Sequence, residues 1–319
     1  MGLLMKEGAK TVFGVFLLFV LVGCAGQEAQ VTEKAFVGGT QGLEITFLPG
    51  RPPQDVFDDP SFKFQIGAKL ENKGEWDILN ANDIEVSVTG INPSSFNVQP
   101  SSLIKKADDP LNGVKINAAG DIVKGDITNV EFPEMNYVTP VSGTLTFSVL
   151  ANVCYEYGTK LQGKLCVRKD LRRLTTQDGL CNPDRNIPFE TSGAPIQITN
   201  VKQSVSGTDK IDIAFTIRKS GASTDSLHKA GTTCDSVQLS NRDVVYVNVK
   251  DTGLGEMKCS GLSGGTATAG YVTLFNGERE MRCSQTISSP IDFETPFNIE
   301  LKYGYKQFVE TKINVKHSS

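Results

Sequence analysis

The chain has 319 residues, of which 39% are hydrophobic and 21% charged, and its formal net charge at pH 7 is −4. This composition provides enough apolar side chains for a folded core and excludes a disordered chain. The mildly acidic balance argues against nucleic acid as a partner, because surfaces that bind nucleic acid are basic. The length corresponds to about two domains.

Residues 1–23 have the features of an export signal. Two lysines precede the apolar run VFGVFLLFVLV at 12–22, which is shorter than the ~20 residues that a membrane-spanning helix needs. The run ends in LVGC at 21–24. This sequence resembles a lipobox, at which lipoproteins receive a diacylglycerol thioether on the cysteine and are cleaved before it. The resemblance implies a lipid on Cys24 that attaches the mature chain to the extracytoplasmic face of a membrane. An uncleaved short anchor is the alternative.

The mature chain begins with a polar stretch and continues as strands. Residues 24–41 are small and polar, and we expect a flexible tether there. Apolar and polar residues then alternate with the period of two that is typical of strands with one buried face. This pattern occurs at 61–70, 83–88, 143–153, 210–217 and 244–249. No stretch of the mature sequence sustains a helical period, so we predict an all-β fold of sandwiches or barrels.

The sequence contains an internal repeat. A shift of about 148 to 152 residues places YEY at 155–157 on YGY at 303–305, and KLCVR at 164–168 on KINVK at 312–316. Apolar strand positions upstream of these motifs match in the same order. The four tyrosines continue the apolar face of their strands, so we expect them in the core before any role in stacking on sugars.

The repeat predicts two copies of one β domain, at 42–168 and 194–317, joined by a linker at 169–193. This layout resembles the tandem immunoglobulin-like sandwiches of prokaryotic cell-surface proteins, including archaeal surface lipoproteins. The resemblance implies two antiparallel β-sandwiches after a lipoprotein signal peptide. The antibody-type core of two cysteines and a tryptophan is absent, because the single Trp76 is far from any cysteine in the sequence.

Six cysteines remain when Cys24 is assigned to lipid. An exported protein meets oxidising conditions, so this even number predicts three disulfides among 15 possible connectivities. Cys154 and Cys166 face each other if a hairpin turns over 158–163, and we expect them to pair. The other expected pairs are Cys259 with Cys283, in neighbouring strands, and Cys181 with Cys234, which would tie the linker to the second domain.

The sequence gives little sign of chemistry. Zinc is the rival interpretation of the cysteines, but there is no C-x-x-C, and His228 and His317 are the only histidines. His228 lies in a polar stretch, where a solvated loop histidine is expected, and His317 is near the chain end. Asp-Asp-Pro at 58–60 and 108–110 could hold calcium or begin turns before proline. We therefore predict no catalytic site, no metal and no cofactor.

The leading hypothesis is a non-enzymatic surface lipoprotein that serves as spacer, scaffold or adhesion module. It would bind a protein or glycan partner through loops or sheet edges. One alternative is an envelope protein that binds a ligand or carbohydrate, which predicts an exposed aromatic or carboxylate cluster. A filament subunit that assembles by strand exchange would need an open groove and a donor strand. A hydrolase would need a pocket that joins His228 to an acid and a nucleophile.

Overall fold

The computed structural model describes residues 34–171, 181–234, 238–288 and 291–318. The predicted signal at 1–23 and Cys24 lie outside these ranges. The described residues form an all-β protein whose sheets are almost entirely antiparallel and pack face to face as in a sandwich. The alternating apolar pattern thus predicts the fold class correctly. Within the described residues, no helix is long and apolar enough to cross a membrane.

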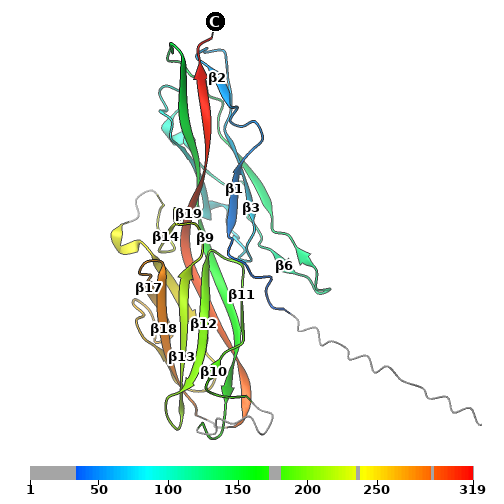
Figure 1. The fold of residues 1–319 in the computed structure, drawn as a ribbon, viewed down its shortest axis with the longest axis vertical. Helices are drawn as coiled ribbons and strands as arrows, with labels where there is room; N and C mark the ends of the chain where they lie inside the picture. The colour runs from blue at the N-terminus through cyan, green and yellow to red at the C-terminus, as the bar shows by residue number, and fades with distance from the viewer. Residues whose placement is uncertain (1–33, 172–180, 235–237, 289–290, 319) are drawn as a thin grey trace, which may run out of the picture. The chain divides into compact units, whose positions relative to one another are not determined.

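Two long strands organise the fold (Figure 1). β9 (Thr144–Val167) and β19 (Phe293–Lys316) each have 24 residues and pair antiparallel over their full length. The turn predicted over 158–163 is wrong, because those residues lie inside β9. Buried side chains continue at every second position on both sides of Gly158. The strand therefore keeps the same face toward the core and has no reason to reverse.

The described residues form three larger sheets, one of which contains this pair. The sheet that contains it is ordered β17-β15-β19-β9-β4-β5, and it adds β15 (Val244–Val249), β17 (Ala269–Thr273), β4 (Ile84–Thr89) and β5 (Ile104–Lys106). A three-stranded sheet consists of β1 (Leu43–Phe47), β3 (Gly67–Asn72) and β8 (Ile127–Glu131). A five-stranded sheet is ordered β10-β12-β13-β18-β16, with bounds Arg185–Asn186, Ile196–Val205, Lys210–Lys219, Glu278–Thr286 and Met257–Cys259.

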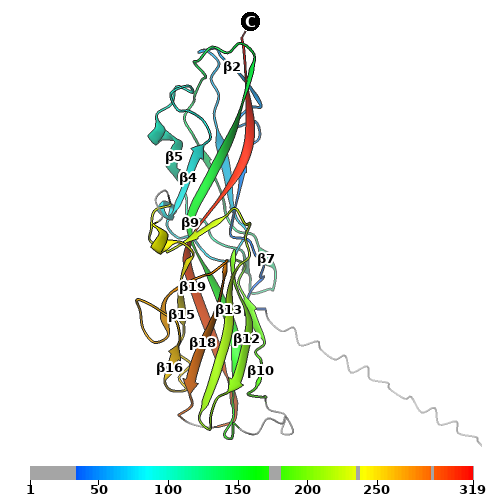
Figure 2. The ribbon, with the colours of Figure 1, turned by 60° about the vertical axis from the view of Figure 1, so that its left-hand side comes forward.

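The short strands complete the edges (Figure 2). β11 (Phe189–Thr191) pairs with β9, and β14 (Ser226–His228) pairs with β19. Among the described strands, β2 (Asp55–Phe57) is the one that pairs in parallel, with the C-terminal end of β19. β6 (Lys115–Ile116) and β7 (Ile122–Val123) form a separate hairpin. The buried apolar side chains of the longer strands form one continuous cluster.

The strand order repeats on the two sides of the long pair. In the long sheet, β4 and β5 lie beside β9 in the same way that β15 and β17 lie beside β19. In the other two sheets, the order β1-β3-β8 corresponds to β12-β13-β18. The ladder pairs Tyr155 with Tyr305 and Tyr157 with Tyr303, so residues offset by 148 exchange places across it. The ladder therefore has a local two-fold axis, which passes between the paired residues Glu156 and Gly304.

The sequence predicts two successive domains at 42–168 and 194–317, but the structure does not divide at these bounds. Residues 306–316 of β19 pair with the first half of β9 and with β2, which belong to the first copy. Each half of the molecule therefore uses one half of both long strands, and Lys34–Ser319 forms one compact unit. Two copies that share a ladder bury more surface than two copies in series, which favours this arrangement.

The four repeated tyrosines lie at the centre of the ladder, where they are buried as expected. The Tyr157 hydroxyl donates to Asn72 Oδ1 at 2.8 Å, and the Tyr305 hydroxyl donates to Asp225 Oδ2 at 2.7 Å. The Tyr155 hydroxyl accepts a bond from the backbone of β1, and that of Tyr303 bonds a threonine hydroxyl of β9. Burial raises the pKa of all four phenols, so they stay neutral and link both halves by directional bonds.

The last part of the predicted tether, residues 34–41, is held against the sheets. Glu75 Oε1 accepts the backbone amide of Val37 at 2.8 Å. Its Oε2 accepts the amides of Gly38 at 2.8 Å and Gly193 at 2.6 Å. One carboxylate therefore fixes the entering chain and the segment before β12 together, and these eight residues are not a free coil as expected.

Gly158 tests how tightly the centre of the ladder is packed. A methyl group on this residue would fall inside the Trp76 ring, so we expect Gly158→Ala to destabilise the fold by about 1–3 kcal/mol through overpacking. The measurement is the free energy of unfolding in urea. Gly143→Ala is the control, because a Cβ there meets nothing within 4 Å. Equal stabilities of the two variants would contradict the packing described here.

Candidate functional site

The structure contains three disulfides. They join Cys154 with Cys234, Cys166 with Cys181, and Cys259 with Cys283. The expected pair of Cys154 and Cys166 is wrong, because both lie on β9, about 40 Å apart at ~3.3 Å per residue. The expected pair of Cys181 and Cys234 is also wrong, because each of these cysteines is bonded to a cysteine of β9. Cys259 and Cys283 are opposite each other in β16 and β18 and pair as expected.

His228 is the central residue of the candidate site. It ends β14, and its backbone is opposite Gly304 in β19. The side chain is 3% exposed, so the expected solvated loop histidine is wrong. The imidazole lies over Gly304, where any Cβ would collide with the ring. The sequence shows β14 only as three residues in a polar stretch, so burial of this histidine had no visible signal.

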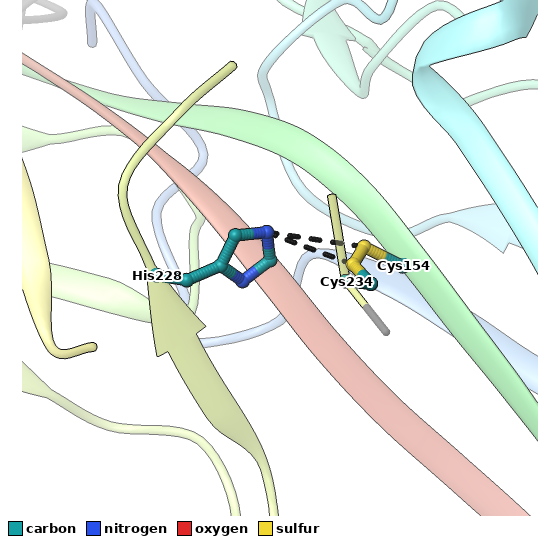
Figure 3. A group of neighbouring side chains, drawn as sticks. All are labelled: Cys154, His228 and Cys234. Atoms are coloured by element: carbon teal, nitrogen blue, oxygen red, sulfur yellow. Dashed lines mark hydrogen bonds between the residues drawn. A yellow bond between two sulfur atoms is a disulfide. The ribbon is translucent and has the colours of Figure 1, made fainter. Parts of the chain in front are cut away.

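The imidazole faces the Cys154–Cys234 disulfide (Figure 3). Its Nε2 atom is 3.9 Å from Cys154 Sγ and 3.6 Å from Cys234 Sγ. Burial, and then the positive charge of Lys306, lower the pKa of His228, so the ring is neutral at pH 7. The hydrolase alternative needs this nitrogen to face a hydroxyl or a substrate, but here it faces sulfur.

A pocket of about 240 Å³ opens beside this cluster. Its lining includes the carboxylates of Asp83, Glu85 and Glu156 and the amine of Lys106. Glu156 Oε1 accepts the backbone amide of Gly231 at 2.6 Å, which fixes the loop between His228 and Cys234. The pocket thus combines three acidic residues, a lysine that pairs with Glu85, an imidazole and two cysteines.

A second site lies on the outer face of the β15–β17 edge. Tyr246 and Tyr271 are opposite each other in these strands, and both are half-buried. Their ring centroids are 5.0 Å apart with the planes at 65°, and Lys229 Nζ is 4.2 Å from the centroid of the Tyr271 ring. Such a pair of accessible aromatic faces beside a cation can stack on a planar or sugar ligand.

Asp58, from the first Asp-Asp-Pro, holds the C-terminal end of the chain. Its carboxylate accepts the backbone amides of Val141 at 2.8 Å and Ser318 at 2.7 Å. It also contacts His317 Nδ1 at 2.8 Å. The bonds from Val141 and then from His317 and Ser318 lower the pKa of this carboxyl. The acid is therefore used in structural contacts, which explains its position without calcium.

Comparisons with known proteins give no family. No protein-family model matches the chain, and no curated protein matches it. Among solved structures, it is similar to the serine-rich repeat adhesion glycoprotein Srr1 of Streptococcus agalactiae, with 10% identity, a TM-score of 0.18, and coverage of 90% of this chain and 99% of that one. For Srr2 of the same species the values are 10%, 0.16, 87% and 93%. Scores this low do not assign a common fold.

The Asp58 contacts predict a pH dependence of stability. Because the folded pKa lies below the unfolded value of about 3.9, Asp58 stabilises the fold above that value, and this stability is lost as the pH falls through the folded pKa. We expect Asp58→Asn to flatten the fall in the free energy of unfolding below pH ~4. Asp59→Asn is the control, because it removes a neighbouring charge and keeps an Oδ1 atom to accept the turn bond from the Ser61 amide. A wild-type acid profile in Asp58→Asn would refute this role.

Proposed function

We propose that the protein is a non-catalytic surface lipoprotein, attached to the extracytoplasmic face of a membrane through lipid on Cys24. Its body would be a pair of immunoglobulin-like sandwiches derived from one repeated domain. Its role would be that of a scaffold or adhesion module, which presents loops and sheet edges to a protein or glycan partner. The continuous β9–β19 ladder is the observation that carries this proposal.

The ladder supports a scaffold role because it makes the two sandwiches mechanically dependent. Opening β9 from β19 in one half exposes the apolar face that the other half shares, so we expect both halves to unfold as one unit. Cys154–Cys234 and Cys166–Cys181 join β9 to two further segments. A rigid body of this kind keeps its loops and edges at fixed positions, as a binding module requires.

The position of the entering chain is compatible with a lipid anchor. The described chain begins at Lys34, ten residues after Cys24. Glu75 then fixes Val37 and Gly38 to the sheets. A lipid on Cys24 would therefore hold Val37 within about 45 Å of the membrane, the greatest reach of 13 extended residues.

The anchor is tested by replacing the lipidated cysteine. We expect Cys24→Ser to abolish incorporation of labelled fatty acid and to move the protein from the membrane fraction to the soluble fraction, because two acyl chains provide the membrane affinity. The double variant Cys259→Ser/Cys283→Ser is the control, since these cysteines form a disulfide. Wild-type protein without fatty acid would refute the anchor and leave the sandwich fold unaffected.

Carbohydrate binding is a second candidate function, and the Tyr246–Tyr271 pair favours it. The two rings lie on an edge of the long sheet with Lys229 above one of them. A sugar ring has apolar C–H faces that pack on aromatic rings, and its hydroxyls can accept a bond from an amine. Strand exchange has less support at the opposite edge, because β5 carries Lys105 and Lys106, and lysines oppose edge-to-edge pairing.

A glycan array tests this second function. If the array identifies a ligand, we expect Tyr246→Ala/Tyr271→Ala to weaken its binding by about tenfold or more, which corresponds to about 1.4 kcal/mol. Phe275→Ala is the control, because Phe275 is an exposed aromatic outside this pair. Unchanged binding in the tyrosine variant would eliminate this surface. An array without any ligand would leave a protein partner as the target of the scaffold.

A further inference from the structure

Three residues of metal-binding types, one of them more than 70 positions before the other two, meet at the centre of the fold. Cys154 comes from the middle of β9, His228 from the end of β14, and Cys234 from the loop that follows. Their sulfur and nitrogen atoms all lie within 4.8 Å of one another. The sequence disfavours zinc because its cysteines lack close spacing, but 80 residues separate the two cysteines that the fold brings together.

The distances fit a common metal centre. Zinc binds a cysteine sulfur at about 2.3 Å and a histidine nitrogen at about 2.0 Å in tetrahedral geometry, which places the two ligand atoms roughly 3.5 Å apart. His228 Nε2 is 3.6 Å from Cys234 Sγ and 3.9 Å from Cys154 Sγ. The imidazole is therefore already where a ligand of a Cys2His site belongs. The sulfur atoms alone must separate, which breaking their bond allows.

The surroundings of the histidine favour coordination. Gly304 leaves room for the ring, and β14 fixes its backbone in the ladder with β19. The adjacent pocket of about 240 Å³ leaves space for water as the fourth ligand.

The other two disulfides are not accompanied by a histidine in this way. The chain has two histidines, and the second, His317, contacts Asp58 at the C-terminal end of β19. Cys259 and Cys283 are instead paired directly across β16 and β18. A histidine ligand is thus supplied at one of the three disulfides, which makes the Cys154–Cys234 bond chemically distinct from the others.

We propose that Cys154, His228 and Cys234 form a binding site for zinc when the Cys154–Cys234 disulfide is reduced. A thiol or phosphine reductant supplies two electrons. With a dithiol, the S–S bond of the protein breaks, two protons are taken up, and the dithiol leaves as its own disulfide. Zinc then displaces both thiol protons and is bound by two thiolates and the imidazole. The disulfide and the metal are alternative states of the same two cysteines.

Cobalt(II) titration of the mature full-length chain tests this site. After reduction with a phosphine, which becomes the phosphine oxide, we expect one cobalt per chain with thiolate charge-transfer and tetrahedral d–d bands. Zinc should displace the cobalt and remove both. Cys154→Ser/Cys234→Ser should abolish the bands. His228→Ala should weaken cobalt binding by at least about tenfold, since loss of a mere supporting partner already costs about 10–100-fold.

Controls separate this site from the other thiols. Cys259→Ser/Cys283→Ser and His317→Ala should keep the bands, because neither changes the proposed ligands. Bound zinc should also protect Cys154 and Cys234, and not Cys259 or Cys283, from alkylation in peptide mapping. This second measurement reads the wild-type chain and does not depend on the folding of a variant. Bands that persist in Cys154→Ser/Cys234→Ser, or equal alkylation of all four cysteines with zinc, would overturn the proposal.

Discussion

The antiparallel pairing of β9 with β19 is the interaction on which the rest of the structure depends. These strands pair residue by residue over 24 residues, and β4, β15, β11, β14 and β2 pair with them and extend their sheet. Because one ladder runs through both halves, neither half has a core that is complete without the other's strand. The pairing therefore converts a duplicated sequence into one cooperative body.

The centre of the ladder shows how the two copies have diverged. The tyrosines are kept in both, and they fill the space around the local two-fold axis. The residues between and beside them differ. Gly158 lies under Trp76, whereas its equivalent is Lys306, and Gly304 lies under His228, whereas its equivalent is Glu156. A glycine in each copy thus admits a different ring, and a buried imidazole next to two cysteines occurs on one side of the axis.

The surfaces of the molecule have a different character from this centre. The outer face of the β15–β17 edge carries two half-buried tyrosine rings with a cation above one of them, while the β5 edge carries lysines. The proposed scaffold role and the proposed metal site are independent, because the first rests on the sheets and the second on three side chains inside them.

The sequence by itself determined the fold class, the repeat and the burial of the four tyrosines. These follow from local patterns, because alternation with a period of two gives the buried face of a strand without knowledge of its partner. The tertiary structure alone decided that 158–163 continues β9, that Cys154 pairs with Cys234, and that His228 is buried. Each of these depends on which distant segment lies alongside, and alternation along one strand carries no information about its neighbour.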